Sequence, residues 1–177
     1  QTQQYQNGTK IERAMIERLP WFERKFSFGL PAAMLAFYLE RLSGTAARME
    51  EKVRGLSDKL MSERFEGKWS IKQNIGHLAE VDHISNKRID EMVAGAETLS
   101  PAVFEPQDYN PWPIERVIAF FRDARKSNLE RYKQLTPKHL SLAPTHPRLK
   151  VKMNPVDLAF FDAEHDDHHL LKISDII

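Results

Sequence analysis

Residues 70–95 read SIKQNIGHLAEVDHISNKRIDEMVAG and carry the clearest secondary-structure signal in the chain. Ser70 and Gln73 form an S-x-x-Q capping box, in which each side chain satisfies a backbone N–H of the other residue. The apolar residues that follow recur every three or four positions, which is the period of an amphipathic helix. Gly95 is a typical stop after the last turn. The stretch therefore predicts one long helix from residue 71 to about residue 93.

Three further segments show the same helical period and are bounded by proline, glycine or asparagine. They cover residues 31–54 with a break near Gly44, residues 113–135 and residues 154–177. A short additional helix is predicted over residues 11–19, and the proline-rich stretches 98–112 and 136–153 are predicted to be surface loops. Four long amphipathic helices without sustained strand-type alternation predict an all-α fold, a four-helix bundle.

Length and composition exclude several classes of protein. The 177 residues suit a single domain, and 26 Lys plus Arg against 25 Asp plus Glu argue against general nucleic-acid binding. The absence of cysteine excludes disulfides, thiolate nucleophiles and Cys-ligated metals. The longest apolar run, residues 32–39, is far shorter than the ~20 residues of a membrane span. No signal peptide is recognisable, so a cytoplasmic location is the default expectation, although a start at Gln1 rather than Met is compatible with removal of an upstream segment.

Histidine placement is the feature that points to chemistry. Residues 164–169 read EHDDHH and hold three of the seven histidines. On a helix, residues four apart have Cβ atoms about 5–6 Å from one another, so His165 and His169 can hold one metal ion. A helical wheel places both beside the apolar face of their helix, and it places His77 on the inner face of the helix that begins after Ser70. Three inward histidines on two helices are typical of a metal site in a bundle.

A structural alternative stays open for these histidines. A single histidine on an apolar face is more often a hydrogen-bonded core residue than a ligand, and an i, i+4 pair alone is a weak motif. The wheel turns His83 and His168 away from the inner faces of their helices. These two residues and His139 are predicted to be ordinary surface residues.

Three aspartates lie near the candidate ligands. Asp162 precedes His165 by three residues on the same stripe, where it could orient a ligand or serve as one. Asp162 and Asp166 are the nearest candidates for a catalytic general base, and neither stands out from the sequence. Asp82 falls on the inner stripe of its helix, where a buried carboxylate needs an arginine or a ring N–H as partner.

Two motifs resemble a known family. Residues 67–78, GKWSIKQNIGHL, resemble the "gkWS-x-x-x-x-lgHL" signature of the DinB/YfiT-like superfamily. His146-Pro147 followed by residues 163–170, AEHDDHHL, resembles its "HP … EHDxHHL" closing segment. The resemblance extends from about Pro31 onward, so residues 1–30 are expected to form an N-terminal extension and residues 31–177 the DinB-like bundle domain.

The resemblance implies a four-helix bundle in up-down-down-up order, with an additional short N-terminal helix in this chain, and a homodimer as the expected assembly. It also implies a divalent metal ion, with zinc or nickel expected, held by His77, His165 and His169. The implied function is a metal-dependent enzyme that activates a thiol or water for transfer to a small electrophilic substrate, as a thiol transferase or a hydrolase. A low-molecular-weight thiol is then the expected co-substrate. The alternative is a non-catalytic bundle that binds a metal or small molecule, or an interaction module.

Overall fold

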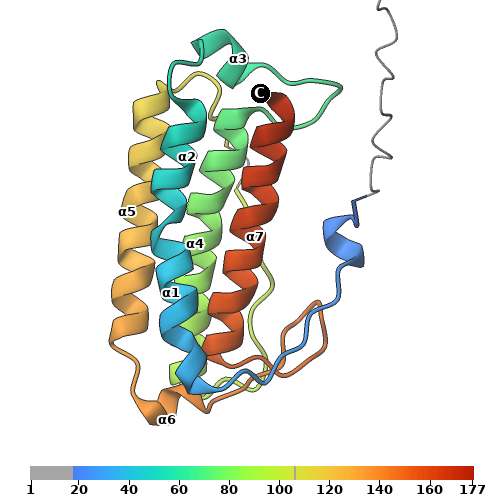
Figure 1. Ribbon diagram of the computed structural model, residues 1–177. Helices are drawn as coiled ribbons and strands as arrows, with labels where there is room; N and C mark the ends of the chain where they lie inside the picture. The colour runs from blue at the N-terminus through green and yellow to red at the C-terminus, as the bar shows by residue number, and fades with distance from the viewer. Residues whose placement is uncertain (1–17, 106) are drawn as a thin grey trace, which may run out of the picture.

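The structure is a computed structural model that describes residues 18–105 and 107–177, and its long helices stand side by side as a bundle (Figure 1). Two 3₁₀ turns, Trp21–Glu23 and Ala32–Met34, precede the first α-helix. The α-helices are α1 (Leu35–Ser43), α2 (Thr45–Val53), α3 (Asp58–Ser62), α4 (Ile71–Val93), α5 (Ile114–Lys133), α6 (Pro137–Leu140) and α7 (Pro155–Ile176). The predicted all-α class is therefore confirmed.

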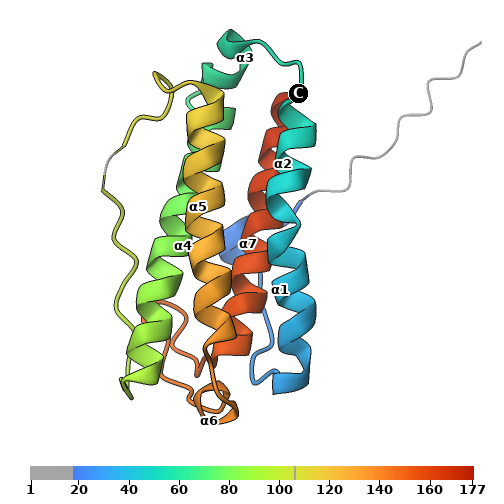
Figure 2. The same cartoon turned by 90° about the vertical axis from the view of Figure 1, so that its left-hand side faces the viewer.

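The helices run in the expected up-down-down-up order. In Figure 1, α1 and α2 rise as one broken column, α4 and α5 both descend, and α7 rises to the C-terminus. The segment between α4 and α5 crosses back along the outside of the bundle, as Figure 2 shows. Because of this crossover, α4 packs against its parallel neighbour α5 on one side and the antiparallel α7 on the other. The pairing of α4 with α7 is what brings the histidine-bearing helices together.

Capping side chains start both of these helices. The Ser70 hydroxyl accepts from the Gln73 N–H at 3.1 Å, and the Gln73 side chain accepts from the Ser70 N–H at 3.0 Å, which confirms the predicted box. Asn154 forms an equivalent box with Asp157 at the start of α7. Asp157 also accepts the N–H groups of residues 29 and 30, both at 2.9 Å. The start of α7 is thereby tied to the segment that leads into α1.

A buried layer of charge separates two apolar clusters in the bundle. Arg125 on α5 donates to Asp82 at 2.8 and 3.0 Å and to Asp166 at 2.6 and 3.0 Å. It also donates to the Leu42 carbonyl at 2.8 Å, which satisfies a backbone acceptor where α1 ends. Asp82 has the arginine partner that its inward position required. Side chains around Ile75 fill one side of this layer, and side chains around Leu158 fill the other.

Some local elements differ from the sequence-based expectation. Helix α6 is a single-turn element within the stretch 136–153 that was predicted to be a loop, and α3 is a single-turn element in a stretch for which no helix was predicted. Ser57 and Thr136 each cap one short turn through a side-chain oxygen. The helix predicted over residues 11–19 lies outside the described residues except for its last two, which are not helical. Within the described ranges, none of the helices combines the length and the apolar character that crossing a membrane demands.

Candidate metal centre

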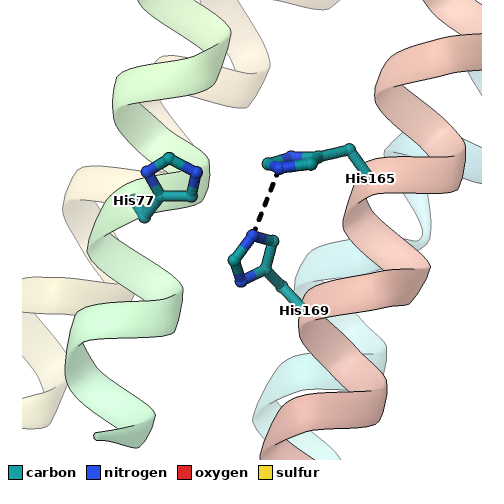
Figure 3. Close-up of side chains that lie close together, drawn as sticks. All are labelled: His77, His165 and His169. Atoms are coloured by element: carbon teal, nitrogen blue, oxygen red, sulfur yellow. Dashed lines mark hydrogen bonds between the residues drawn. The ribbon is translucent and has the colours of Figure 1, made fainter. Parts of the chain in front are cut away.

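The three predicted ligands face one another across the groove between α4 and α7. Figure 3 shows His77 opposite the pair formed by His165 and His169. One ring nitrogen from each lies within 4.8 Å of the others, and the two Nε2 atoms of the α7 pair are 3.2 Å apart. Two imidazole nitrogens bound at ~2.0–2.1 Å to one tetrahedral zinc ion stand about 3.3 Å apart. The α7 pair already has the spacing of two ligands, and a small movement of His77 would complete the set.

Asn74, one turn before His77, orients one of these rings. Its side-chain oxygen lies 2.7 Å from His169 Nδ1. The Asn74 amide nitrogen donates to the Ser70 carbonyl at 2.8 Å, so the oxygen must face the histidine. His169 therefore carries its proton on Nδ1 and directs the Nε2 lone pair toward His165. Such outer hydrogen bonds fix the tautomer of metal-binding histidines.

Burial keeps the three imidazoles neutral. It lowers the pKa of His77 to about 4, with the charges of Lys172 and His168 contributing in the same direction. Burial also holds the pKa values of His165 and His169 well below 6.5, and the neighbouring imidazoles lower them further. Only neutral imidazole offers a lone pair to a metal, so all three are in the binding form at pH 7 without losing a proton. The donor set and its protonation state both fit a borderline divalent cation such as zinc or nickel.

A carboxylate lies beside His77. Glu80 Oε2 is 3.7 Å from His77 Nδ1, and Glu80 Oε1 accepts the Tyr109 hydroxyl at 2.6 Å. Tyr109 packs so tightly on α4 that a Cβ at Gly76 would lie 2.3 Å from its ring. Burial raises the pKa of Glu80 despite that hydrogen bond. Tyr109 thus holds Glu80 at the edge of the histidine cluster, and its ring can pack this close to α4 because residue 76 is a glycine.

The histidines open into a cleft of about 1510 Å³ along α4 and α7. Aromatic rings form its walls near the cluster: Trp69 lies 4.7 Å from His77 between ring centroids, and Phe104 lies 4.8 Å from the same ring. Trp21 stands 5.0 Å from the His165 ring. These rings and the three histidines line the same cleft, through which a small molecule can approach the cluster.

The other predicted histidines occupy different settings. His83 is exposed, and the ring of His139 accepts a backbone N–H at the start of α6, as suits residues at the surface. His168 was predicted to be solvated, and that prediction is wrong. Its ring is half-buried 5.3 Å from Trp21 and lines the cleft, because the segment before α1 folds back over this face of α7. Burial lowers the pKa of His168 to about 4.

The two aspartates suggested as general bases differ in placement. Asp162 is buried, lines the cleft and lies outside the group of nitrogens that could share a metal. Burial raises its pKa to about 7. Asp166 faces the bundle core, where both of its oxygens are bound by Arg125 and one also accepts the Thr45 hydroxyl at 2.6 Å. That placement gives Asp166 a structural role.

Sequence reasoning missed several residues that shape the site. Asn74 and Glu80 flank His77 at i−3 and i+3 on α4, so helical spacing could have drawn attention to both. Trp69 is part of the motif at residues 67–78 but was given no role in the site, and Phe104 carries no sequence signal, because it lies in a loop that only the tertiary fold brings to the cluster.

Comparison with known proteins agrees with this geometry. A family model described as the DinB superfamily matches residues 41–173. The chain belongs to the DinB superfamily. The matched region of this DinB-superfamily chain contains all three histidines of the cluster, the whole of α2, α4 and α5, and most of α7. A search of curated proteins finds no match.

Among solved structures, the fold of this DinB-superfamily chain is similar to that of a bacterial protein. It is YfiT from Bacillus subtilis, described as a probable metal-dependent hydrolase with an unusual four-helix bundle topology. The match covers 86% of this chain and 91% of YfiT, with a TM-score of 0.74 and 16% sequence identity. At that identity the likeness establishes the common four-helix bundle.

Proposed function

We propose that this protein is a divalent-metal-dependent enzyme, in which His77, His165 and His169 hold the metal and the cleft admits a small electrophilic substrate. The observation that carries the proposal is the convergence of three neutral imidazoles, with nitrogens within 4.8 Å, at an open cleft. Three protein ligands and one open position are the pattern of catalytic rather than structural zinc. The description of YfiT as a probable metal-dependent hydrolase supports the same class.

The metal would act as a Lewis acid that lowers the pKa of a coordinated water or thiol toward neutrality. The chain supplies the remaining functions. Asn74 holds the His169 tautomer, and the aromatic walls exclude bulk water from the reacting groups. Glu80 lies next to His77, lines the cleft and has a raised pKa, so we assign it the role of proton acceptor for the attacking group.

The proposal is tested by metal content and turnover together. Full-length protein is stripped with chelator, reloaded with zinc or nickel, and assayed for hydrolysis of activated esters and for thiol addition to small electrophiles. We expect His77→Ala, His165→Ala and His169→Ala each to lower metal affinity strongly and to abolish turnover. His83→Ala is the matched control, because this exposed histidine is on the same helix as His77 and should change neither.

The two assays also separate the alternatives. Turnover only in the presence of a thiol would identify a thiol transferase, and thiol-independent ester cleavage would identify a hydrolase. Stoichiometric metal without turnover on either panel would favour the non-catalytic metal-binding bundle. A His169→Ala variant that keeps wild-type metal affinity would contradict the site itself.

A further inference from the structure

A second polar group lies deep in the cleft, away from the histidine cluster. Arg88 on α4 is 7% exposed and lines the cleft. Within the part of the chain that the structure describes, its Nε is enclosed without an acceptor and its guanidinium enters no ion pair within 4.0 Å. Buried arginines are ordinarily paired, because an unpaired buried charge is strongly destabilising. Among the described residues, Arg88 therefore has no ion-pair partner.

The acidic groups near Arg88 do not fill this role. Glu91 accepts the backbone N–H of Ser100 at 2.8 Å and is also bound by the Ser100 hydroxyl, so its oxygens are engaged elsewhere. Asp162 lies beyond ion-pair distance, and its Oδ2 has no partner among the described residues. Burial raises the pKa of Asp162 to about 7, which reduces its charge at neutral pH. Among the described residues the guanidinium thus lines the cleft without a direct ion pair, and the carboxylates of Asp162 and Glu91 act on its charge only from beyond 4.0 Å.

His146 supplies a second donor without an acceptor in the same region. Its Nδ1 accepts the backbone N–H groups of Arg148 at 3.3 Å and Leu149 at 3.1 Å. The proton of the neutral ring must then be on Nε2, which is buried and unpartnered among the described residues. The residue is 2% exposed and lines the cleft with Arg88. Two buried donors without acceptors, from separate segments of the chain, point to a missing acceptor group.

Helix α4 fixes the position of this group relative to the histidine cluster. His77 and Arg88 are eleven residues apart, which is about three turns and roughly 16 Å along one face of the helix. Val81 and Ile84 lie between them on that face and line the cleft. The floor of the cleft thus presents the candidate metal centre, then an apolar stretch, then a guanidinium.

We propose that Arg88 anchors a carboxylate at the end of an apolar substrate whose reacting group lies at the histidine cluster. The position of the reacting group rests on the proposed function, whereas the anchoring of the carboxylate does not. A planar guanidinium matches a carboxylate in bidentate geometry. A phosphate dianion fits less well, since a single buried cation would face two charges beside the Asp162 carboxyl group. The substrate class is therefore an apolar monocarboxylate.

The anchoring is tested on the metal-free, full-length protein by calorimetric titration with octanoate and with its neutral analogue octanamide. We expect octanoate to bind tenfold or more tightly than octanamide. Arg88→Met should remove this preference without weakening octanamide binding, and Arg88→Lys should restore part of it. Arg148→Met and Lys172→Met remove other cations that line the cleft and serve as controls. Both should keep most of the preference, because the Arg148 charge acts on Arg88 without sharing its position in the cleft floor. Circular dichroism verifies that each variant is folded.

Three results would overturn the assignment: equal binding of the two probes, a preference that persists in Arg88→Met, or a preference lost in Arg148→Met instead. Tighter binding of octyl phosphate than of octanoate would overturn the choice of carboxylate. Because these titrations use no metal, their failure leaves the proposed function standing, and failure of the metal assays leaves the anion site standing.

The spacing is tested on zinc-loaded protein with straight-chain hydroxamic acids that end in a carboxylate or its methyl ester. The hydroxamate binds the metal, so the esters report on the histidine centre alone. We expect the carboxylate to improve binding over the ester only in chains long enough to reach Arg88. An equal gain at every chain length would show that the carboxylate is bound elsewhere.

Discussion

The hydrogen bond from His169 to Asn74 offers the sharpest test of the site, through the substitution Asn74→Leu. Leucine has a similar size, so it removes the acceptor without opening room for water. The bond is 2.7 Å long between residues that are 1% and 3% exposed, so solvent cannot replace it. Loss of an outer partner of a metal-binding histidine typically weakens affinity by about 10–100-fold, or about 1.4–2.7 kcal/mol. We expect a result in the upper half of that range, because the buried Nδ1–H is left without an acceptor.

Zinc affinity is measured by competition with a chromophoric chelator at pH 7. Asn86→Leu is the matched control, since it makes the same chemical change on α4 at a residue that bonds to Ser127 and Asn128 on α5, away from the histidine cluster. Asn74→Asp retains an acceptor for the histidine and should keep zinc affinity near the wild-type value. Thermal unfolding of each variant without metal separates loss of affinity from loss of fold. A folded Asn74→Leu protein with zinc affinity within about twofold of wild type would refute the argument that Asn74 orients His169 for metal binding.

Four further outcomes are expected. Gly76→Ala should lower the free energy of unfolding by about 1–2 kcal/mol in urea unfolding. The added Cβ would lie 2.3 Å from the Tyr109 ring, and this clash outweighs the ~1 kcal/mol gain in helix propensity. A more stable variant would show that the Tyr109 ring moves aside without cost. Arg125→Met should cost about 3–5 kcal/mol at pH 7, since two buried carboxylates lose their counter-ion, and the loss should shrink in acid as they take up protons. The free energy of unfolding of the metal-free protein should fall more between about pH 6.5 and 4 in the wild type than in His77→Leu, because unfolded histidines bind protons near 6.5 whereas folded His77 binds one only near 4. Equal pH dependence of the two proteins would contradict the burial of His77. His168→Ala should leave zinc content unchanged, as its ring is outside the three-nitrogen group, and a loss measured by elemental analysis would place it among the ligands.

Local chemistry determined most of the bundle in advance. Capping boxes, proline starts and the 3.6-residue period depend on residues within a few positions of one another, and the start at Ser70 and the break near Gly44 both appear where the sequence indicated them. The same periodicity identified the inward face of α4, from which the need of Asp82 for a buried partner followed. Single-turn elements such as α3 were not predicted, because a single turn is too short to show the helical repeat of apolar residues.

The sequence by itself therefore determined the helices, their inward faces and the three histidines that converge. Only the tertiary structure decided which groups meet across helices: the choice of Arg125 as the partner of Asp82 depends on how α4 and α5 are rotated against each other. The burial of His168 depends on the path of the segment around Trp21, which no helical wheel contains. Likewise, only the packed structure shows that no acidic group of the described residues pairs with Arg88, because ion pairing depends on distances between segments that are remote in sequence.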